Sequence, residues 1–215
     1  MNKRMLIFAS GRGSNAEALH EAAVDGTIKG TIVGVICDHH DAPVLQRAER
    51  WKVPATVIEM KTCRDKADYN EKILEAAKSY APDLICLAGY MRICGENLIK
   101  AFENRIINVH PSLIPSFCGE GFYGLRVHEA ALAKGAIEAG VKVAGCTVHF
   151  VGTGLDDGPI ITQVAVPVYD HDTEDTLSAR ILAEEHPAYV RAVKAYCEDK
   201  LHIAGHTVTG MHEEE

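Results

Sequence analysis

Short apolar runs alternate with amphipathic stretches along the first half of the chain, and this alternation restricts the possible folds more than any other feature. The apolar runs are Met5–Ala9, Thr31–Cys37, Ala55–Ile58, Leu84–Ala88 and Ile106–Val109. The amphipathic stretches between them, with apolar residues three and four positions apart, are Ser14–Val24, Ala42–Trp51, Lys66–Ser79 and Gly95–Ala101. Uninterrupted apolar strands are typical of a parallel sheet that is covered on both faces. The pattern therefore predicts an α/β fold, with a doubly wound, mostly parallel, Rossmann-like sheet and helices on both faces.

The second half of the chain continues with longer elements. A helical stretch at Leu125–Lys134 precedes two predicted strands, Val143–Val151 and Ile160–Val168. Thr173, which two acidic residues follow, predicts the N-cap of a long helix that ends near Lys200.

No linker, repeat or low-complexity segment interrupts the sequence, so we expect a single domain over residues 1–215. Within it we distinguish an N-terminal half (about 1–105) and a C-terminal half (about 106–200). The tail, 201–215, predicts a small strand pair and a frayed end.

Composition argues against several classes of protein. The formal net charge of −8 disfavours a nucleic-acid partner, since nucleic acids are bound through clustered Lys and Arg. No apolar run approaches the roughly 20 residues that cross a membrane. The run at Met5–Ala9 meets a glycine turn at once, so we expect a first strand there and not a signal peptide. The 7 cysteines are scattered and odd in number, which is typical of reduced thiols in the cytoplasm.

Two polar residues stand at the end of an apolar strand in the segment Ile106–Pro115. Asn108 and His110 are two positions apart, so on a strand both point to the same side. An amide beside an imidazole packs poorly in a core, but both groups can donate hydrogen bonds to a negatively charged oxygen. An isolated histidine in such a strand would favour a structural role, whereas the neighbouring Asn108 favours a catalytic one.

A second apolar strand, Val148–Val151, leads into a glycine-rich loop that carries Asp156 and Asp157. The two segments together contain Asn-x-His-Pro-Ser-Leu and, downstream, His-x-Val-x-x-x-Leu-Asp-x-Gly-Pro. In order and spacing they resemble the formyltransferase family that uses 10-formyltetrahydrofolate. The resemblance extends from the first strand to about Lys200.

The resemblance implies a catalytic set of Asn108, His110 and Asp156. In such an enzyme an amine attacks a formyl carbon, and Asn108 and protonated His110 donate to the oxyanion of the tetrahedral intermediate. Asp156 would favour the charged imidazole and would accept, through water, the proton that the amine releases. Asp157 would cap the loop.

The stretch Ser10–Asn15 follows the first predicted strand and opens the first predicted helix. Glycine allows the backbone to approach a ligand closely, and the start of a helix attracts anions. In the family this loop binds the 5-phosphate of a glycinamide ribonucleotide, which implies ribonucleotide contacts at Gly11, Arg12, Gly13, Ser14 and Asn15. A dinucleotide site stays open as an alternative. Asp38 stands where a ribose-binding acid is expected, although Ala16 replaces the third glycine.

The segment Ala88–Cys94 follows the fourth predicted strand, at the carboxyl edge where α/β sheets bind ligands. The resemblance implies folate contacts at Met91, Arg92, Ile93, Cys94 and Asn108. The arginine that the family usually has near the start of the third helix is replaced by Lys66. Lys66, or the nearby Arg64, would then meet the folate tail.

Three further segments carry polar or loop-forming residues: the long predicted helix, residues 117–128 and Asp38–Asp41. Glu185, inside the long predicted helix, would by itself belong to a solvated face, but the resemblance implies a contact with the ribose hydroxyls. Residues 117–128 predict a mobile loop on the substrate side. Asp38–Asp41, with two adjacent histidines, favours a solvated turn over a metal site, and we expect no metal.

The resemblance implies transfer of a formyl group from 10-formyltetrahydrofolate to the amine of 5-phosphoribosylglycinamide, in de novo purine biosynthesis. We expect a cytoplasmic monomer or homodimer whose partners are these small molecules. A methionyl-tRNA formyltransferase adds a C-terminal domain and a basic surface, and a formyltetrahydrofolate deformylase adds an N-terminal domain, so both would be longer. A nucleotide-binding module without activity would need the glycine loop but not Asn108, His110 and Asp156 together.

Overall fold

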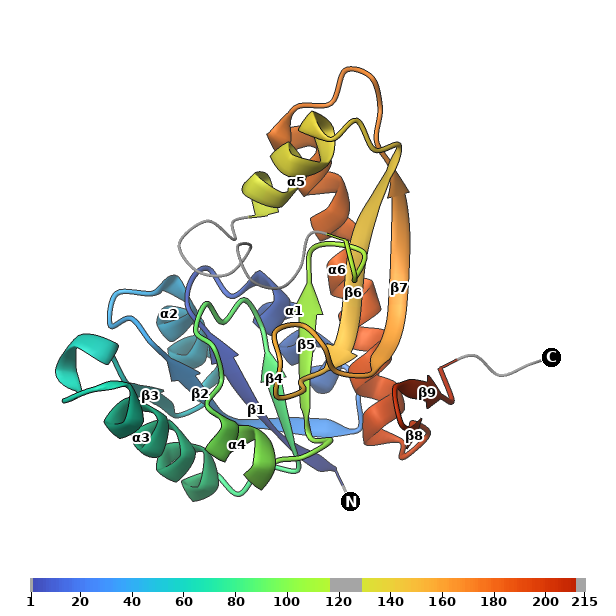
Figure 1. Ribbon diagram of the computed structural model, residues 1–215. Helices are drawn as coiled ribbons and strands as arrows, with labels where there is room; N and C mark the ends of the chain where they lie inside the picture. Colours follow the sequence, from blue (N-terminus) through green and yellow to red (C-terminus); the bar gives the residue numbers. More distant parts are fainter. Residues whose placement is uncertain (1, 117–128, 212–215) are drawn as a thin grey trace. The chain divides into compact units, whose positions relative to one another are not determined.

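The computed structural model describes residues 2–116 and 129–211 (Figure 1). The chain forms two compact units, Met1–Asn108 and Val109–Glu215, which divide close to the expected boundary between the two halves. The expectation of one domain stays a prediction.

The N-terminal unit is built on parallel strands. They are β1 (Lys3–Ala9), β2 (Gly30–Cys37), β3 (Ala55–Val57), β4 (Leu84–Leu87) and β5 (Ile106–His110), whose last residues belong to the second unit. Their order is β3-β2-β1-β4-β5, and each of the four pairs in this row is parallel. The chain therefore extends the sheet first on one side of β1 and then on the other, as in a doubly wound fold.

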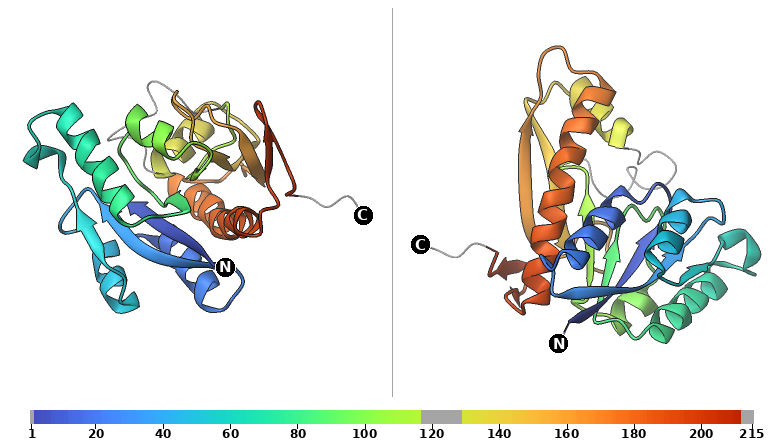
Figure 2. Two further views of the ribbon diagram at one scale, coloured as in Figure 1. Left: turned by 90° about the horizontal axis from the view of Figure 1, so that it is seen from below. Right: turned by 180° about the vertical axis from the view of Figure 1, so that it is seen from behind.

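Helices cover both faces of this sheet, as the sequence predicts. They are α1 (Ser14–Val24), α2 (Pro43–Trp51), α3 (Lys66–Ser79) and α4 (Glu96–Ala101), with a short 3-10 turn η1 (Met60–Thr62) before α3. In Figure 1 α3 and α4 lie in front of the sheet, and in the rear view of Figure 2 α1 and α2 lie in front of it. The mostly parallel α/β class is confirmed.

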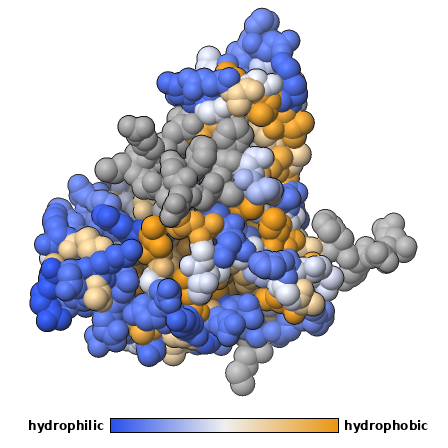
Figure 3. Space-filling view, in the orientation of Figure 1, coloured by the Kyte–Doolittle hydropathy of each residue, from blue (hydrophilic) through white to orange (hydrophobic). Residues whose placement is uncertain are grey.

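Local sequence explains where these elements begin and what they bury. Pro43 occupies the start of α2, and the Asp65 carboxylate accepts a hydrogen bond from the Asp68 amide (2.8 Å) to cap α3. The apolar side chains of β1 and β4 are buried, and each Leu, Ile, Phe or Met among them contributes about 1.5–3 kcal/mol. The outer surface over α3 is mainly hydrophilic (lower left in Figure 3), as an amphipathic helix requires.

The C-terminal unit centres on an antiparallel pair, β6 (Val143–Phe150) and β7 (Ile160–Pro167). Helix α6 (Glu174–Cys197) packs against both strands and against α5 (Glu129–Glu138). The tail forms the predicted strand pair, β8 (His202–Ala204) and β9 (Thr207–Thr209), which is antiparallel, and β9 pairs with β7.

The start of α6 has the expected cap. The Thr173 hydroxyl accepts a hydrogen bond from the Thr176 amide (3.2 Å), and the Thr176 hydroxyl accepts one from the Thr173 amide (2.9 Å). This reciprocal pair is a capping box, which satisfies two amides that the helix itself cannot. Arg180 donates to both carboxylate oxygens of Asp172 (2.7 Å each) and so ties the preceding turn to the helix.

The element order matches the prediction, and the differences lie at the ends of elements. Helix α5 runs to Glu138, beyond the predicted Lys134, and the predicted start at Leu125 lies outside the described residues. The loop predicted at 117–128 also lies outside them. In the part of the chain that is described, no helix combines the length and the apolar character that crossing a bilayer requires.

Candidate active site

The segments after β1, β2 and β4 start at one edge of the N-terminal sheet. In the pairing register Ala9 lies opposite Cys37, Phe8 opposite Leu87, and Leu87 opposite Asn108. These strands therefore end level with one another. The order of the sheet switches between β1 and β4, and ligands of doubly wound folds bind at such a switch point.

The glycine loop after β1 uses its two glycines differently. Gly13 has a positive φ (73°) and caps α1, and a Cβ there would lie 2.6 Å from Cγ2 of Val44 in α2. Gly13 is therefore required by the fold itself. A Cβ at Gly11 would meet no described atom within 4 Å, so Gly11 leaves open space above the loop.

The start of α1 supplies a favourable place for an anion. The first helical hydrogen bond runs from the Glu17 amide to the Gly13 carbonyl (2.9 Å), so the amides of Ser14 and Asn15 precede the helical ladder. Gly13 has no side chain to cap them, and the helix dipole adds positive potential there. Arg12 is exposed beside them, and its carbonyl accepts from Nε of Arg47 (2.8 Å).

The segment after β4 is fastened to the residue before the glycine loop. The Ser10 amide donates to the Gly89 carbonyl (3.1 Å), and the Met91 amide donates to the Ser10 hydroxyl (2.8 Å). The hydroxyls of Tyr90 and Tyr69 are 2.6 Å apart and buried. Met91 and Ile93 are 40% and 44% exposed, unusual values for large apolar residues and suited to packing against a flat ring.

The remaining folate candidates have defined surroundings. Burial raises the pKa of the Cys94 thiol to about 12, so Cys94 is protonated at neutral pH and can contribute packing but no thiolate chemistry. Lys66 is exposed at the first residue of α3. Arg64 instead donates to Asp68 (3.0 Å), which leaves Lys66 as the better candidate of the two for a carboxylate tail.

Asp38 corrects two expectations. Its side chain is 0% exposed and accepts hydrogen bonds from Nε of Arg92 (2.8 Å) and Nδ1 of His39 (2.9 Å). A carboxylate so enclosed cannot bind a ribose, which removes the dinucleotide alternative. It also does not belong to a solvated turn, although His39, His40 and Asp41 are exposed. Within residues 2–116 and 129–211 no cluster of three His, Cys, Asp or Glu side chains could hold a metal ion.

In the C-terminal unit His110 and Asp156 lie together, as the sequence predicts. Nδ1 of His110 is 3.9 Å from Oδ1 of Asp156, and their side chains are 6% and 4% exposed. Opposite charges at this separation attract each other far more strongly in a buried site than in water. Asn108 is half-buried at the end of the N-terminal unit, two residues before His110 on β5.

The loop that carries Asp156 is closed by its neighbour. Oδ2 of Asp157 accepts a hydrogen bond from the Gly154 amide (3.0 Å), which gives Asp157 the expected capping role. A Cβ at Gly158 would collide with the carbonyl of Phe150, so only glycine fits there. Asp156 adopts a positive φ (53°), a conformation that the surrounding loop imposes on a non-glycine residue.

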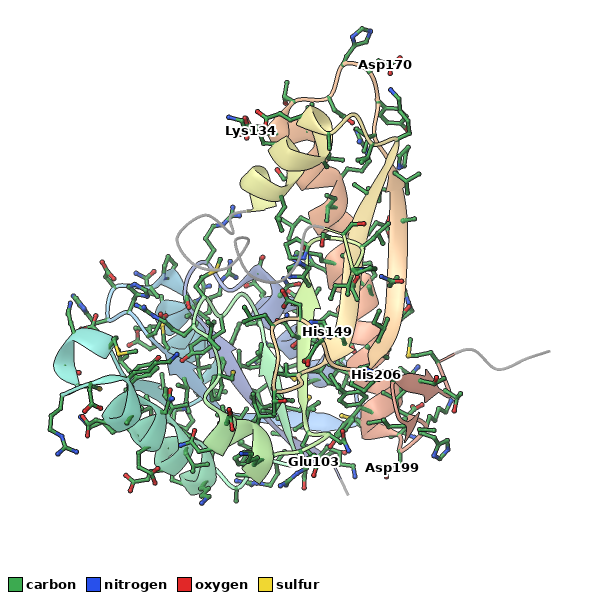
Figure 4. The ribbon with its side chains drawn as sticks, viewed as in Figure 1. Glu103, Lys134, His149, Asp170, Asp199 and His206 are labelled. Carbon is green, nitrogen blue, oxygen red and sulfur yellow. The ribbon has the colours of Figure 1, made fainter. Side chains whose placement is uncertain are left out.

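His149, at the end of β6, is a residue that the sequence analysis did not single out (Figure 4). Its ring is buried, and its Nδ1 lies 2.8 Å from the Phe150 carbonyl, to which it donates. Burial lowers the pKa of His149, so the ring is neutral at neutral pH and its Nε2 is a hydrogen-bond acceptor. The feature of the sequence that points to it is its place as the first residue of the His-x-Val motif.

A polar network holds the chain after His110. The buried hydroxyl of Thr147 donates to the Ser112 carbonyl (2.7 Å) and accepts from the Ile114 amide (3.0 Å). Gln163 on β7 donates to the Thr147 hydroxyl (2.9 Å) and to the Ile114 carbonyl (3.0 Å). The network fixes the proline-rich segment that follows His110 and thereby restricts the direction in which β5 ends.

Glu185 does not lie on a solvated face, the alternative that its position in a helix alone would favour. It lies in α6 and is 2% exposed, whereas Glu184 is half-buried. Burial, with a smaller contribution from the Glu185 charge, raises the pKa of Cys146 to about 12. A carboxylate that is buried in this way is better suited to binding a polar ligand than to contact with bulk water.

Comparison with known proteins shows the family to which the chain is similar. The family model for formyl transferase matches residues 3–193. The phosphoribosylglycinamide formyltransferase of Bacillus subtilis is 40% identical over 192 residues, or 89% of this chain and 93% of that protein. The chloroplastic phosphoribosylglycinamide formyltransferase of Vigna unguiculata is 36% identical over 199 residues, and the aligned region spans 62% of its length.

A solved structure agrees over a similar extent. Glycinamide ribonucleotide transformylase 1 from Symbiobacterium toebii matches with a TM-score of 0.88 and 42% identity, covering 96% of this chain and 92% of that one. The matched region includes both the glycine loop of the N-terminal unit and the His110–Asp156 pair of the C-terminal unit. The chain thus belongs to the formyl transferase family.

Proposed function

We propose that this protein transfers a formyl group from 10-formyltetrahydrofolate to the amine of 5-phosphoribosylglycinamide, a step of de novo purine biosynthesis. The buried pair of His110 and Asp156, 3.9 Å apart and preceded on the same strand by Asn108, carries the proposal. The relatives from Bacillus subtilis and Vigna unguiculata, which are named for this activity, support it.

The chemistry follows from these three residues. The substrate amine attacks the formyl carbon, forming a C–N bond and a tetrahedral intermediate with a negatively charged oxygen. The Asn108 amide and the His110 imidazolium donate hydrogen bonds to that oxygen. Asp156 favours the charged imidazole and accepts, through water, the proton that the amine loses. Collapse of the intermediate breaks the bond to N10 of the folate, which takes up a proton as it leaves.

The two substrates would use different segments. The phosphate of the ribonucleotide would bind at the open space above Gly11, to the first amides of α1 and to Arg12. Glu185 would accept hydrogen bonds from the ribose hydroxyls. The folate ring would pack on Met91, Arg92, Ile93 and Cys94, and Lys66 would meet its carboxylate tail.

A paired assay tests the activity. The purified protein is given 10-formyltetrahydrofolate, once with 5-phosphoribosylglycinamide and once without it, and formylated amine and free formate are both measured. Formylated amine in the first reaction only, without formate in the second, is the expected result. Formate in both reactions would indicate a hydrolase, and no turnover in either would indicate a binding module.

We further propose that the protein works in the cytoplasm as a monomer or homodimer with small molecules as its partners. The cysteines in the described ranges are all free thiols, and the net charge of −8 gives no attraction to nucleic acid. Sedimentation velocity at several concentrations would distinguish a monomer from a dimer. Fractionation of cells that express a tagged chain would test the location.

A further inference from the structure

Asp38 stands out among the buried charged groups, because the proposed reaction does not use it. It follows β2, at the same edge of the sheet as the glycine loop and the segment after β4. Its carboxylate is 0% exposed. A buried carboxylate is costly unless it is paired, so its partners identify its role.

The main partner of Asp38 is Arg92, which lies in the proposed folate segment. Nε of Arg92 donates to Oδ2 of Asp38 (2.8 Å), and Oδ1 of Asp38 accepts from His39 (2.9 Å). The arginine side chain is 38% exposed, so its charged end is fixed at a buried acceptor while part of it remains accessible. Both oxygens of the carboxylate are thus engaged.

The same segment is fastened at the preceding positions. The Gly89 carbonyl and the Met91 amide both bond to Ser10, and the Tyr90 hydroxyl bonds to that of Tyr69. Asp38 adds a charged contact at the next residue, Arg92. Each of the four successive residues 89–92 therefore makes a contact with a residue that is distant in the sequence. These contacts fix the position from which the backbone continues to Ile93 and Cys94.

We infer that Asp38 is a positioning residue for the folate segment: through Arg92 it sets the backbone of Met91–Cys94 that receives the folate ring. The inference rests on the proposed function. Replacing a buried ion pair by apolar residues often leaves the stability of a protein unchanged or raises it. Conformational specificity therefore explains the Asp38–Arg92 pair better than stability does. A misplacement of about 1 Å far from the reacting atoms can cost an enzyme about 10²-fold in rate, and we expect a displaced contact surface to weaken ligand binding in the same manner.

Asp38→Asn tests the inference, because asparagine keeps the size of the side chain and removes its charge. Affinity for the stable analogue 10-formyl-5,8-dideazafolate and for 5-phosphoribosylglycinamide is measured separately by calorimetry. We expect the Kd for the folate analogue to rise about 10-fold or more. The Kd for the ribonucleotide and kcat at saturating folate should stay within about twofold of the parent values, a split that a general loss of structure would not produce.

The chain offers a matched control. Asp172 is a second buried carboxylate paired with an arginine, Arg180, at 2.7 Å, with 4% of its side chain exposed. Asp172→Asn removes a comparable ion pair outside the folate segment. It should lower stability as Asp38→Asn does and leave both ligand affinities unchanged.

A double-mutant cycle gives an independent readout. If Asp38 acts only through Arg92, then Asp38→Asn should weaken binding of the folate analogue in the parent protein but not further in the Arg92→Met variant, because the second change then removes nothing more. Should Asp38→Asn fail to fold, Asp38→Glu gives the same measurement, since it keeps the negative charge but moves the carboxylate relative to Nε of Arg92.

The outcomes separate the inference from the proposed function. A parent protein that neither binds the analogue nor transfers the formyl group overturns both. If the parent does both and folded Asp38→Asn keeps its folate affinity, the inference alone is wrong. Equal losses for both ligands, or fully additive effects in the cycle, would likewise overturn the positioning role.

Discussion

Nδ1 of His110 lies 3.9 Å from Oδ1 of Asp156, and each side chain is almost fully buried. The separation is longer than a hydrogen bond, so no direct bond between these two atoms fixes the orientation of either ring or carboxylate. In the proposed mechanism Nδ1 of His110 faces the Asp156 carboxylate and Nε2 donates to the substrate oxygen. The arrangement resembles an electrostatic site prepared before the substrate arrives.

Removal of either oxyanion donor should lower the rate severely. His110→Ala and Asn108→Ala are each expected to reduce kcat on the order of 10²–10³, because each removes a hydrogen bond that forms mainly in the transition state. The Kd for 10-formyl-5,8-dideazafolate should change much less. Steady-state kinetics with calorimetry would check both values, and near-normal turnover in a folded variant would contradict the assignment.

Asp156→Asn should be nearly inactive while remaining folded. Asparagine preserves the size of the side chain and the loop, but it removes the negative charge that the proposed mechanism uses beside His110 and the base that would receive the proton. Asp157→Asn is the matched control, since its remaining oxygen can still accept from the Gly154 amide. The kcat of the two variants is compared at equal thermal stability; a fully active Asp156→Asn would refute the catalytic role.

The two glycines of the first loop should respond differently to substitution. Gly11→Val adds a side chain in open space, so we expect a large rise in the KM for 5-phosphoribosylglycinamide with stability and folate-analogue affinity nearly unchanged. Gly13→Ala should instead lower the unfolding free energy by about 1 kcal/mol or more, because it forces a positive φ and a clash with Val44. Kinetics and chemical denaturation of both variants give the comparison. If Gly11→Val weakened binding of the folate analogue instead, the two substrates would have been assigned to the wrong loops.

Stability should fall in mild acid through His149. Burial lowers its pKa below the ordinary value of 6.5, so the folded protein binds this proton less readily than the unfolded chain. Above about pH 6.5 neither state is protonated and the contribution vanishes; below it the unfolded state alone gains the proton, and the unfolding free energy falls with pH by up to about 1.4 kcal/mol per pH unit.

His149→Asn isolates this effect, because the asparagine amide can still donate to the Phe150 carbonyl and does not titrate. Urea denaturation at a series of pH values from about 5 to about 7.5 should give a shallower slope for the variant than for the parent. Identical slopes would mean that other groups cause the acid sensitivity.

The arrangement of elements could be predicted because it depends on local pattern. Continuous apolar runs such as Leu84–Leu87 indicate strands that are buried on both faces. The placement of Asn108 and His110 on the same side of β5 follows from the two-residue period of a strand. The capping box at Thr173 is likewise a short-range feature. Each of these features is encoded within a few consecutive residues of the sequence.

Features that depend on distant residues could not be predicted in this way. Asp38 looks like a turn residue until Arg92, 54 positions later, is seen to enclose it. In the sequence Gly13 suggests room for a ligand, but the structure requires glycine there because Val44 lies too close for a Cβ. His149 gives no sign in the sequence that its ring is kept neutral. In each case the deciding contact comes from packing between elements, which the local pattern does not contain.

Ser10 has a consequence for how the two substrates influence each other. Through its amide and its hydroxyl it is bonded to both Gly89 and Met91, and it immediately precedes Gly11. We therefore expect the two loops to move together, so that a ligand that reduces the motion of one loop also reduces the motion of the other. The second ligand then has less motional entropy to remove, so each substrate should bind more tightly in the presence of its companion even if neither loop changes its shape.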